Sequence, residues 1–162
     1  MFQTARIAAA SKPELYAELT RQAEHLLAGE RDRIANAANF AALAWQHLPA
    51  INWCGFYFFD GRELVVGPFQ GKPACIRIAL GRGVCGTAAV TRTTQRVADV
   101  GAFPGHIACD GDSRSEIVVP LLHADGTLLG VWDVDSPERA RFDADDQAGM
   151  QRLCAVFMAS LG

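Results

Sequence analysis

Short turns between hydrophobic runs are the sequence feature that most limits how this chain can fold. Asp60-Gly61 follows the aromatic-rich run 53–59, and Ala124-Asp125-Gly126 follows the run 116–123. A connection this short joins antiparallel neighbours, whereas parallel strands need a crossover of about a dozen residues or more. The middle of the chain therefore predicts antiparallel hairpins rather than an alternating parallel fold.

Helical patterns occupy both ends of the chain. Ser11, Pro13 and Glu14 form a helix start, and apolar residues recur at helical spacing from there up to Gly29. Further helices are predicted over residues 32–47, 84–93 and after Phe142-Asp143, and strands over 53–59, 63–69, 74–80, 96–100, 116–123 and 128–135. This order indicates an α+β fold with an antiparallel sheet. No linker or repeat divides residues 1–162, so we expect one domain.

Composition excludes several classes of protein. The chain is 50% hydrophobic and 20% charged with a formal net charge of −3, which is ordinary for a globular protein. The sequence has no stripe of Lys and Arg residues, so it does not indicate nucleic-acid binding. No apolar run approaches the roughly 20 residues of a membrane span, and the apolar piece near the N-terminus is too short for a signal peptide, so we expect a cytoplasmic protein without a membrane partner. The exposed pair of N-terminal helices is compatible with a homodimer.

The five cysteines differ in their surroundings. Cys154 lies on an apolar helical stripe and Cys54 lies within a strand, so both are expected to be buried core residues. Cys85 begins a predicted helix after a Gly-x-Gly turn, where the helix dipole can lower the pKa of a thiol, although the same glycines serve a tight turn. Cys109 stands among Gly, His and Asp in a loop with no apolar stripe to fill, which favours a chemical role. Cys75 is placed early in the strand 74–80.

A metal site is the first alternative for these thiols. His106 and Cys109 have a His-x2-Cys spacing, and Cys85 or Cys75 could add a further zinc ligand. No Cys-x2-Cys pair occurs in the chain, and the zinc-deaminase pattern is missing. We therefore expect no metal, and instead separated thiols that the fold brings together. The odd number of cysteines also argues against a structural disulfide framework.

Acidic and aromatic residues share faces of two predicted strands. Asp133 and Asp135 are two residues apart and leave the same face, and Glu116 starts the neighbouring strand. Either the strand ends there and the acids are solvated, or the three acids converge, attract a cation and raise the pKa of at least one carboxyl. Trp53 and Tyr57 also share a face, which fits core packing or an aromatic wall for a small apolar group.

Several motifs together resemble one known family. They are Trp-Cys-Gly-Phe-Tyr, Gly-x-Gly-x-Cys-Gly, Gly-His-Ile-Ala-Cys-Asp at 105–110, Ser-Glu-Ile-Val-x-Pro and Gly-Val-x-Asp-x-Asp-Ser, in this order. The set resembles the free methionine-(R)-sulfoxide reductases, a stand-alone branch of the GAF domains, from about residue 12 to the end. The resemblance implies a six-stranded antiparallel sheet with helices on one side. Trp132 replaces a more usual aliphatic residue, and the loop 110–113 also departs from the usual pattern.

The resemblance also implies roles for particular residues. Cys109 corresponds to the catalytic thiol, Cys75 to the resolving thiol and Cys85 to a third cysteine that can substitute in resolution. The pocket residues correspond to Glu116, Asp133 and Asp135 as acids and to Trp53 and Tyr57 as aromatic wall. The implied enzyme reduces free methionine sulfoxide through a sulfenic acid and an intramolecular disulfide that thioredoxin recycles, without a cofactor. The alternative is a GAF module that binds a small molecule or senses redox state without turnover.

Overall fold

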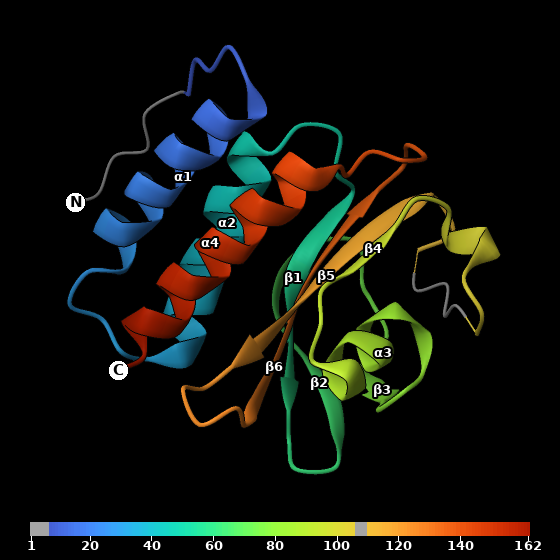
Figure 1. Cartoon of the computed structure of the whole chain (residues 1–162). Helices are drawn as coiled ribbons and strands as arrows, with labels where there is room; N and C mark the ends of the chain where they lie inside the picture. The colour runs from blue at the N-terminus through green and yellow to red at the C-terminus, as the bar shows by residue number, and fades with distance from the viewer. Residues whose placement is uncertain (1–6, 106–109) are drawn as a thin grey trace.

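The computed structural model describes residues 7–105 and 110–162 (Figure 1). Its helices are α1 (Lys12–Leu27), α2 (Arg33–His47), α3 (Gly83–Thr91) and α4 (Ala144–Ser160), with a 3-10 turn at Val100–Ala102. Its strands are β1 (Trp53–Phe59), β2 (Glu63–Gly71), β3 (Arg77–Ala79), β4 (Gln95–Val97), β5 (Ser115–Leu122) and β6 (Leu128–Ser136). None of the helices in these described ranges is both long enough and apolar enough to cross a membrane.

The strands form one six-stranded sheet in the order β3-β2-β1-β6-β5-β4. Each neighbouring pair is antiparallel, which confirms the fold class predicted from the hairpin turns. The two predicted hairpins, β1–β2 and β5–β6, pair through β1 and β6 at the centre of the sheet. The first and last strands of the chain are thereby brought side by side.

The sheet is covered on both faces. Helices α1, α2 and α4 pack side by side on one face (Figure 1), over a core that includes Leu19, Phe40, Phe56, Trp132 and Phe157. Helix α3 and strand β3 close a smaller core on the other face, with Tyr57, Leu64, Val84, Ala88 and Val118. The expectation of helices on one side is therefore right for α1, α2 and α4 and wrong for α3. Alternation along the central strands decides which side chains face which helix.

Trp132 lies on the face of the sheet that the three long helices cover. Its side chain is fully buried, and its ring meets that of Phe40 edge-to-face with 4.9 Å between the centroids. The prediction that this unusual residue faces the core is confirmed. Because Asp133 follows it on a strand, the neighbouring acid points to the opposite face.

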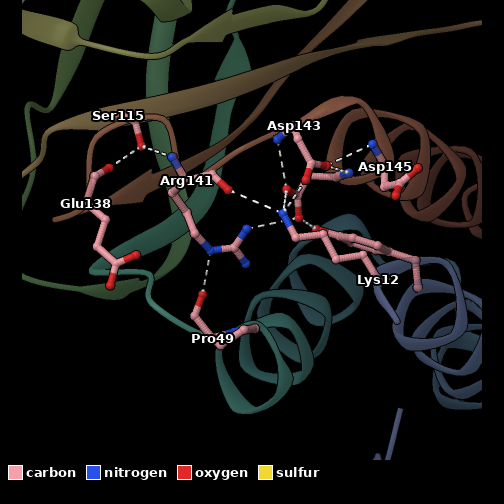
Figure 2. A network of polar contacts seen from close by, with 9 residues as sticks. Lys12, Pro49, Ser115, Glu138, Arg141, Asp143 and Asp145 are labelled. Atoms are coloured by element: carbon pink, nitrogen blue, oxygen red, sulfur yellow. Dashed lines mark hydrogen bonds and ion pairs between the residues drawn. The ribbon is translucent and has the colours of Figure 1, made fainter. Parts of the chain in front are cut away.

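Buried polar contacts join α1 to α4 at one end of the helical layer (Figure 2). Asp146 is fully buried and accepts hydrogen bonds from the Tyr16 hydroxyl (2.9 Å), Arg141 Nη1 (3.0 Å) and Lys12 Nζ (2.5 Å). Tyr16 reaches Asp146 because Gly149 has no side chain: a Cβ there would lie 2.1 Å from the Tyr16 ring.

The same contacts continue into the start of β5 (Figure 2). Arg141 donates from Nε to the Pro49 carbonyl (3.0 Å) and from its backbone N–H to Ser115 Oγ (3.3 Å). Ser115 Oγ in turn donates to the Glu138 carbonyl (2.6 Å). The network therefore fixes the start of β5 and the segment that follows β6 relative to the helices.

Two predicted strands are shorter in the structure. The strand expected over 74–80 is reduced to β3, since Pro73 has no N–H for a ladder and Cys75 lies in the connection that follows. The strand expected over 96–100 is β4, and Val100 instead begins the 3-10 turn, whose first N–H groups Asp99 caps by accepting from Gly101 (3.0 Å).

Candidate active site

Strand register brings the three predicted acids together beneath α3. Glu116 lies opposite Asp135 in the β5–β6 pairing, and Asp133 lies one two-residue step further along the same face. Glu116 and Asp133 are each 6% exposed, and Asp135 is partly buried. Of the two alternatives, convergence of the acids is right and a solvated strand end is wrong.

The acids line two adjoining hollows. The larger, of about 380 Å³, is bordered by Tyr57, Ile78, Arg82, Gly83, Val84, Cys85, Asp110, Ser113, Glu116, Asp133 and Asp135. The smaller, of about 220 Å³, is bordered by Trp53, Tyr57, Pro73, Ala74, Asp110, Asp133 and Asp135. Because Tyr57, Asp133 and Asp135 belong to both walls, the two hollows form one site with a thiol-lined side and an aromatic side.

Burial keeps protons on these carboxyls. It raises the pKa of Asp133 to about 7 and the pKa values of Glu116 and Asp135 well above their usual range, and the neighbouring negative charges add to the rise at Glu116 and Asp135. Glu116 and Asp133 share a hydrogen bond, which requires a proton on one of them. Asp133 Oδ1 is buried and has no hydrogen-bond partner among the described residues. The site can therefore both donate a proton and receive a cation.

Cys85 is the thiol that the structure places in this cluster. It lies in the first turn of α3, buried, with Sγ 3.9 Å from Glu116 Oε1. Its pKa is raised well above the usual value, first by burial and then by Asp133. The lowered pKa that a helix start permits is therefore not found, because loss of solvation outweighs the helix dipole here.

The same three side chains are the ones that could hold a metal ion among the described residues. One ligand atom from each of Cys85, Glu116 and Asp133 lies within 4.8 Å of the others. Shared protons account for the same convergence, since each of these groups has a raised pKa. The expectation of no metal stays a prediction.

The aromatic pair faces the smaller hollow. Trp53 and Tyr57 stack with 5.7 Å between ring centroids, and Trp53 also stacks on Phe69 at 5.2 Å. Both predicted residues are almost fully buried, and Trp53 Nε1 donates to the Lys72 carbonyl (3.2 Å). The pattern therefore serves core packing and a pocket wall at once.

The other cysteines separate into two groups. Cys54 and Cys154 are buried free thiols in the core beneath the long helices, which confirms the prediction for both. Cys75 is partly buried and disulfide-bonded. Cys109, the predicted nucleophile, and His106 lie outside the described residues.

Two polar residues of the loop before β5 escaped the sequence prediction. Asp110 accepts from Asn52 Nδ2 (3.2 Å) and from the Asp112 N–H (3.0 Å), and pairs with Lys72 Nζ at 3.3 Å. The Asp112 N–H, more than Lys72, lowers the pKa of Asp110, so the site has an ionised acid at its edge. Ser113 accepts from Asn52 Nδ2 (3.1 Å) and bonds the Asp135 carboxyl. Asp110 follows Cys109 directly in the sequence and Ser113 comes four residues after it. This closeness to the predicted nucleophile was the available signal for both.

Comparisons with known proteins agree with this site. The family model of the GAF domain matches residues 13–161. The free methionine-R-sulfoxide reductase of Escherichia coli (strain K12) is 49% identical over 145 residues, 90% of this chain and 87% of that protein.

Solved structures match equally well. The free methionine-R-sulfoxide reductase from Neisseria meningitidis in complex with its substrate is 44% identical, with a TM-score of 0.94 over 99% of this chain and 96% of that chain. A structure assigned provisionally to a GAF sensor protein from Burkholderia vietnamiensis is 67% identical, with a TM-score of 0.91 over 94% of this chain and 99% of that one. The chain therefore belongs to the GAF-domain family and, within it, to the free methionine-R-sulfoxide reductases.

Proposed function

We propose that this protein reduces free methionine-R-sulfoxide to methionine, with thiols as the source of electrons. The observation that carries the proposal is the buried group of three carboxyls facing an aromatic wall, in a chain 49% identical to a reductase of that name. The preference for the R epimer rests on the relatives alone.

The site matches the chemical parts of the free amino acid. A substrate α-ammonium suits the carboxyl group, where Asp133 Oδ1 has no partner among the described residues. Its arrival stabilises the ionised form of a nearby carboxyl and so releases a proton. This ammonium exists only on the free amino acid, because a peptide bond removes it. The S-methyl group suits the wall of Trp53 and Tyr57.

The start of α3 supplies a partner for the substrate carboxylate. Gly83, Val84 and Cys85 line the larger hollow, and no side chain among the described residues caps this helix. Their backbone N–H groups lack partners within the helix, and together with the helix dipole they favour an anion. The two charged ends of an amino acid thereby receive opposite partners in one pocket.

The proposed reaction begins at Cys109. Its thiolate attacks the sulfoxide sulfur while the carboxyl proton held between Glu116 and Asp133 is given to the oxygen. The hydroxyl so formed then passes from the substrate sulfur to Cys109 Sγ as the bond between the two sulfurs breaks, so methionine leaves and Cys109 becomes a sulfenic acid. Asp110, the next residue in the chain, borders both hollows, which supports a thiol delivered from this loop.

The sulfenic acid is then resolved by a second thiol. We assign this role to Cys75, which condenses with Cys109 to a disulfide and releases water; thioredoxin returns both thiols. The disulfide-bonded state of Cys75 supports the assignment. Cys85 lies beside the acids in the same pocket and remains the proposed substitute in resolution. A homodimer and a cytoplasmic location remain predictions.

An assay with four substrates tests the proposal. Free and peptide-bound methionine sulfoxide are supplied as R and S epimers, with dithiothreitol or thioredoxin as reductant. We expect turnover of the free R epimer alone and none with Cys109→Ser. Full activity of Cys109→Ser would contradict the proposed nucleophile. Saturable binding of the free sulfoxide without turnover would instead favour the sensor alternative.

A further inference from the structure

Exposed apolar side chains lie at both ends of β3 and on α3, which packs beside it. Among the described residues, three of the five large apolar side chains that are exposed lie here: Ile76 (69% exposed), Leu80 (38%) and Val90 (54%). Ile76 immediately precedes β3, Leu80 immediately follows it, and Val90 lies on α3, which packs beside β3 (Figure 1). We call these three residues the Ile76 patch.

The patch adjoins the disulfide. Ile76 is the next residue after Cys75, which is disulfide-bonded and only partly buried. Strand β3 is at the edge of the sheet, and no strand within residues 7–105 and 110–162 covers its outer side. A single exposed apolar side chain is ordinary on a protein surface, but three such side chains on adjacent elements beside a disulfide are typical of an interaction site.

The segment around the patch is positively charged. Residues 71–83 contain Lys72, Arg77 and Arg82 and no acidic residue, in a chain whose formal net charge is −3. Lys72 and Arg77 are held in ion pairs with Asp110 and with Glu63, among others. Arg82 is exposed and makes no ion pair with a described residue. Arg82 is therefore the cation of this segment that is left to pair with an acidic residue of a partner, beside an apolar contact at the patch.

We propose that the Ile76 patch is the docking surface for the dithiol protein that reduces the Cys75 disulfide, and that this protein attacks Cys75 Sγ. The partner is a reductase of the thioredoxin class with an apolar surface around its reactive thiol and acidic residues at the margin. The inference rests on the proposed function, because a reductant is needed only if the disulfide turns over.

The exchange balances as two thiol–disulfide steps. A thiolate of the partner attacks Cys75 Sγ and forms a mixed disulfide, and the sulfur bonded to Cys75 leaves as a thiolate and takes a proton. The second thiol of the partner then attacks its own first sulfur, and Cys75 leaves and takes the second proton. Two electrons pass from the partner, which becomes a disulfide, to the two cysteines of this chain.

One variant and a matched control separate docking from chemistry. Ile76→Ser removes the most exposed apolar side chain of the patch, and Ile34→Ser makes the same change at a half-exposed isoleucine on α2, across the sheet. With thioredoxin as reductant we expect Ile76→Ser to raise the KM for thioredoxin about tenfold, and Ile34→Ser to leave it unchanged. With dithiothreitol, which needs no docking surface, both variants should match the wild type.

The outcomes distinguish the two proposals. No turnover of the wild type with dithiothreitol would overturn the proposed function itself. Wild-type turnover with dithiothreitol, combined with an unchanged thioredoxin KM for Ile76→Ser, would overturn the docking surface alone.

The attacked sulfur is identified by trapping. Thioredoxin whose second active-site cysteine is replaced by serine cannot complete the exchange and stays bonded to this chain. Peptide mapping by mass spectrometry should then find it on the peptide that contains Cys75. Attachment to the peptide of Cys85 or Cys109 would overturn the assignment of Cys75 as the sulfur attacked.

Discussion

Carboxyl groups are buried in two places, on opposite faces of the same sheet, and their hydrogen-bond and ion-pair partners differ. Asp146, in the first turn of α4, accepts hydrogen bonds from Arg141, Lys12 and the Tyr16 hydroxyl (Figure 2). Asp133, beneath α3, makes no ion pair with a described lysine or arginine, and one of its oxygens has no hydrogen-bond partner there. Both side chains are almost completely removed from water.

The difference separates a structural carboxylate from a functional one. Burying a charge is unfavourable unless cations and donors replace its water, and Asp146 has both. At Asp133 burial instead raises the pKa to about 7, so the group holds a proton or accepts a cation from outside. A buried carboxyl without a counter-charge lowers the stability of the folded protein. We therefore expect a ligand to supply the positive charge that the protein itself does not supply.

The largest effect on the free energy of unfolding is expected from breaking the buried ion pairs of Asp146. Asp146→Asn leaves the nearly buried Arg141 guanidinium without its counter-charge, while Lys12 keeps its ion pair with Asp143. Removing one partner of a buried ion pair lowers the free energy of unfolding by about 3–5 kcal/mol, measured by urea denaturation. The folded fraction should keep its kcat, since the substituted side chain lies across the sheet from the pocket.

The neighbouring residue provides the control for this substitution. Asp145 is in the same helical turn but is exposed. Asp145→Asn should change the free energy of unfolding by less than about 1 kcal/mol. Equal losses for the two variants would mean that the helix start, rather than the buried pair, is what Asp146 stabilises.

The next largest effect is expected in the acid cluster beneath α3, and on kcat rather than on the free energy of unfolding. Glu116→Gln keeps a hydrogen-bonding group of the same shape beside Asp133 but cannot give up a proton. We expect kcat for free methionine sulfoxide to fall about 10²-fold, and the free energy of unfolding to stay level or rise. Glu138→Gln, at an exposed glutamate near the end of β6, should change neither. An unchanged kcat in Glu116→Gln would remove Glu116 from proton transfer.

The sequence predicted the parts of this site that depend on strand periodicity. Asp133 and Asp135 share a face wherever a strand contains them, and the turn at Ala124-Asp125-Gly126 pairs that strand with Glu116. The same holds for Trp53 and Tyr57. Two-residue spacing and a hairpin turn are local properties, so no knowledge of the remaining chain is needed.

The missed features depend on tertiary packing. The raised pKa of Cys85 follows from α3 lying against the sheet, which no pattern within residues 81–91 encodes. Asp110 and Ser113 join the site through a loop, where side chains have no period to follow. The helix at 84–93 was predicted, but its place on the second face was missed for the same reason: α3 is too short and too uniformly apolar to reveal which face it covers.

The smallest expected effect is a difference in how stability depends on pH. In the unfolded chain Asp133 loses its proton near the ordinary value of 3.8, and in the folded chain near 7. Between these values the folded state binds more protons, so raising the pH favours unfolding: the stabilisation is complete below about pH 4 and is lost as the pH rises through 7.

Asp133→Asn removes this titration and should make the curve less steep, while Glu116 and Asp135, whose pKa values are also raised, still titrate. From urea denaturation at pH 5 and pH 8, we expect the wild type to lose more unfolding free energy than the variant, by about 2–3 kcal/mol. Asp145→Asn, which changes an exposed carboxylate, should follow the wild type. Parallel curves for wild type and Asp133→Asn would mean that Asp133 is already ionised at pH 5. A cation would then have to neutralise Asp133 in the absence of a bound ligand. Asp133 would in that case be a paired carboxylate like Asp146, and the two sites would no longer differ.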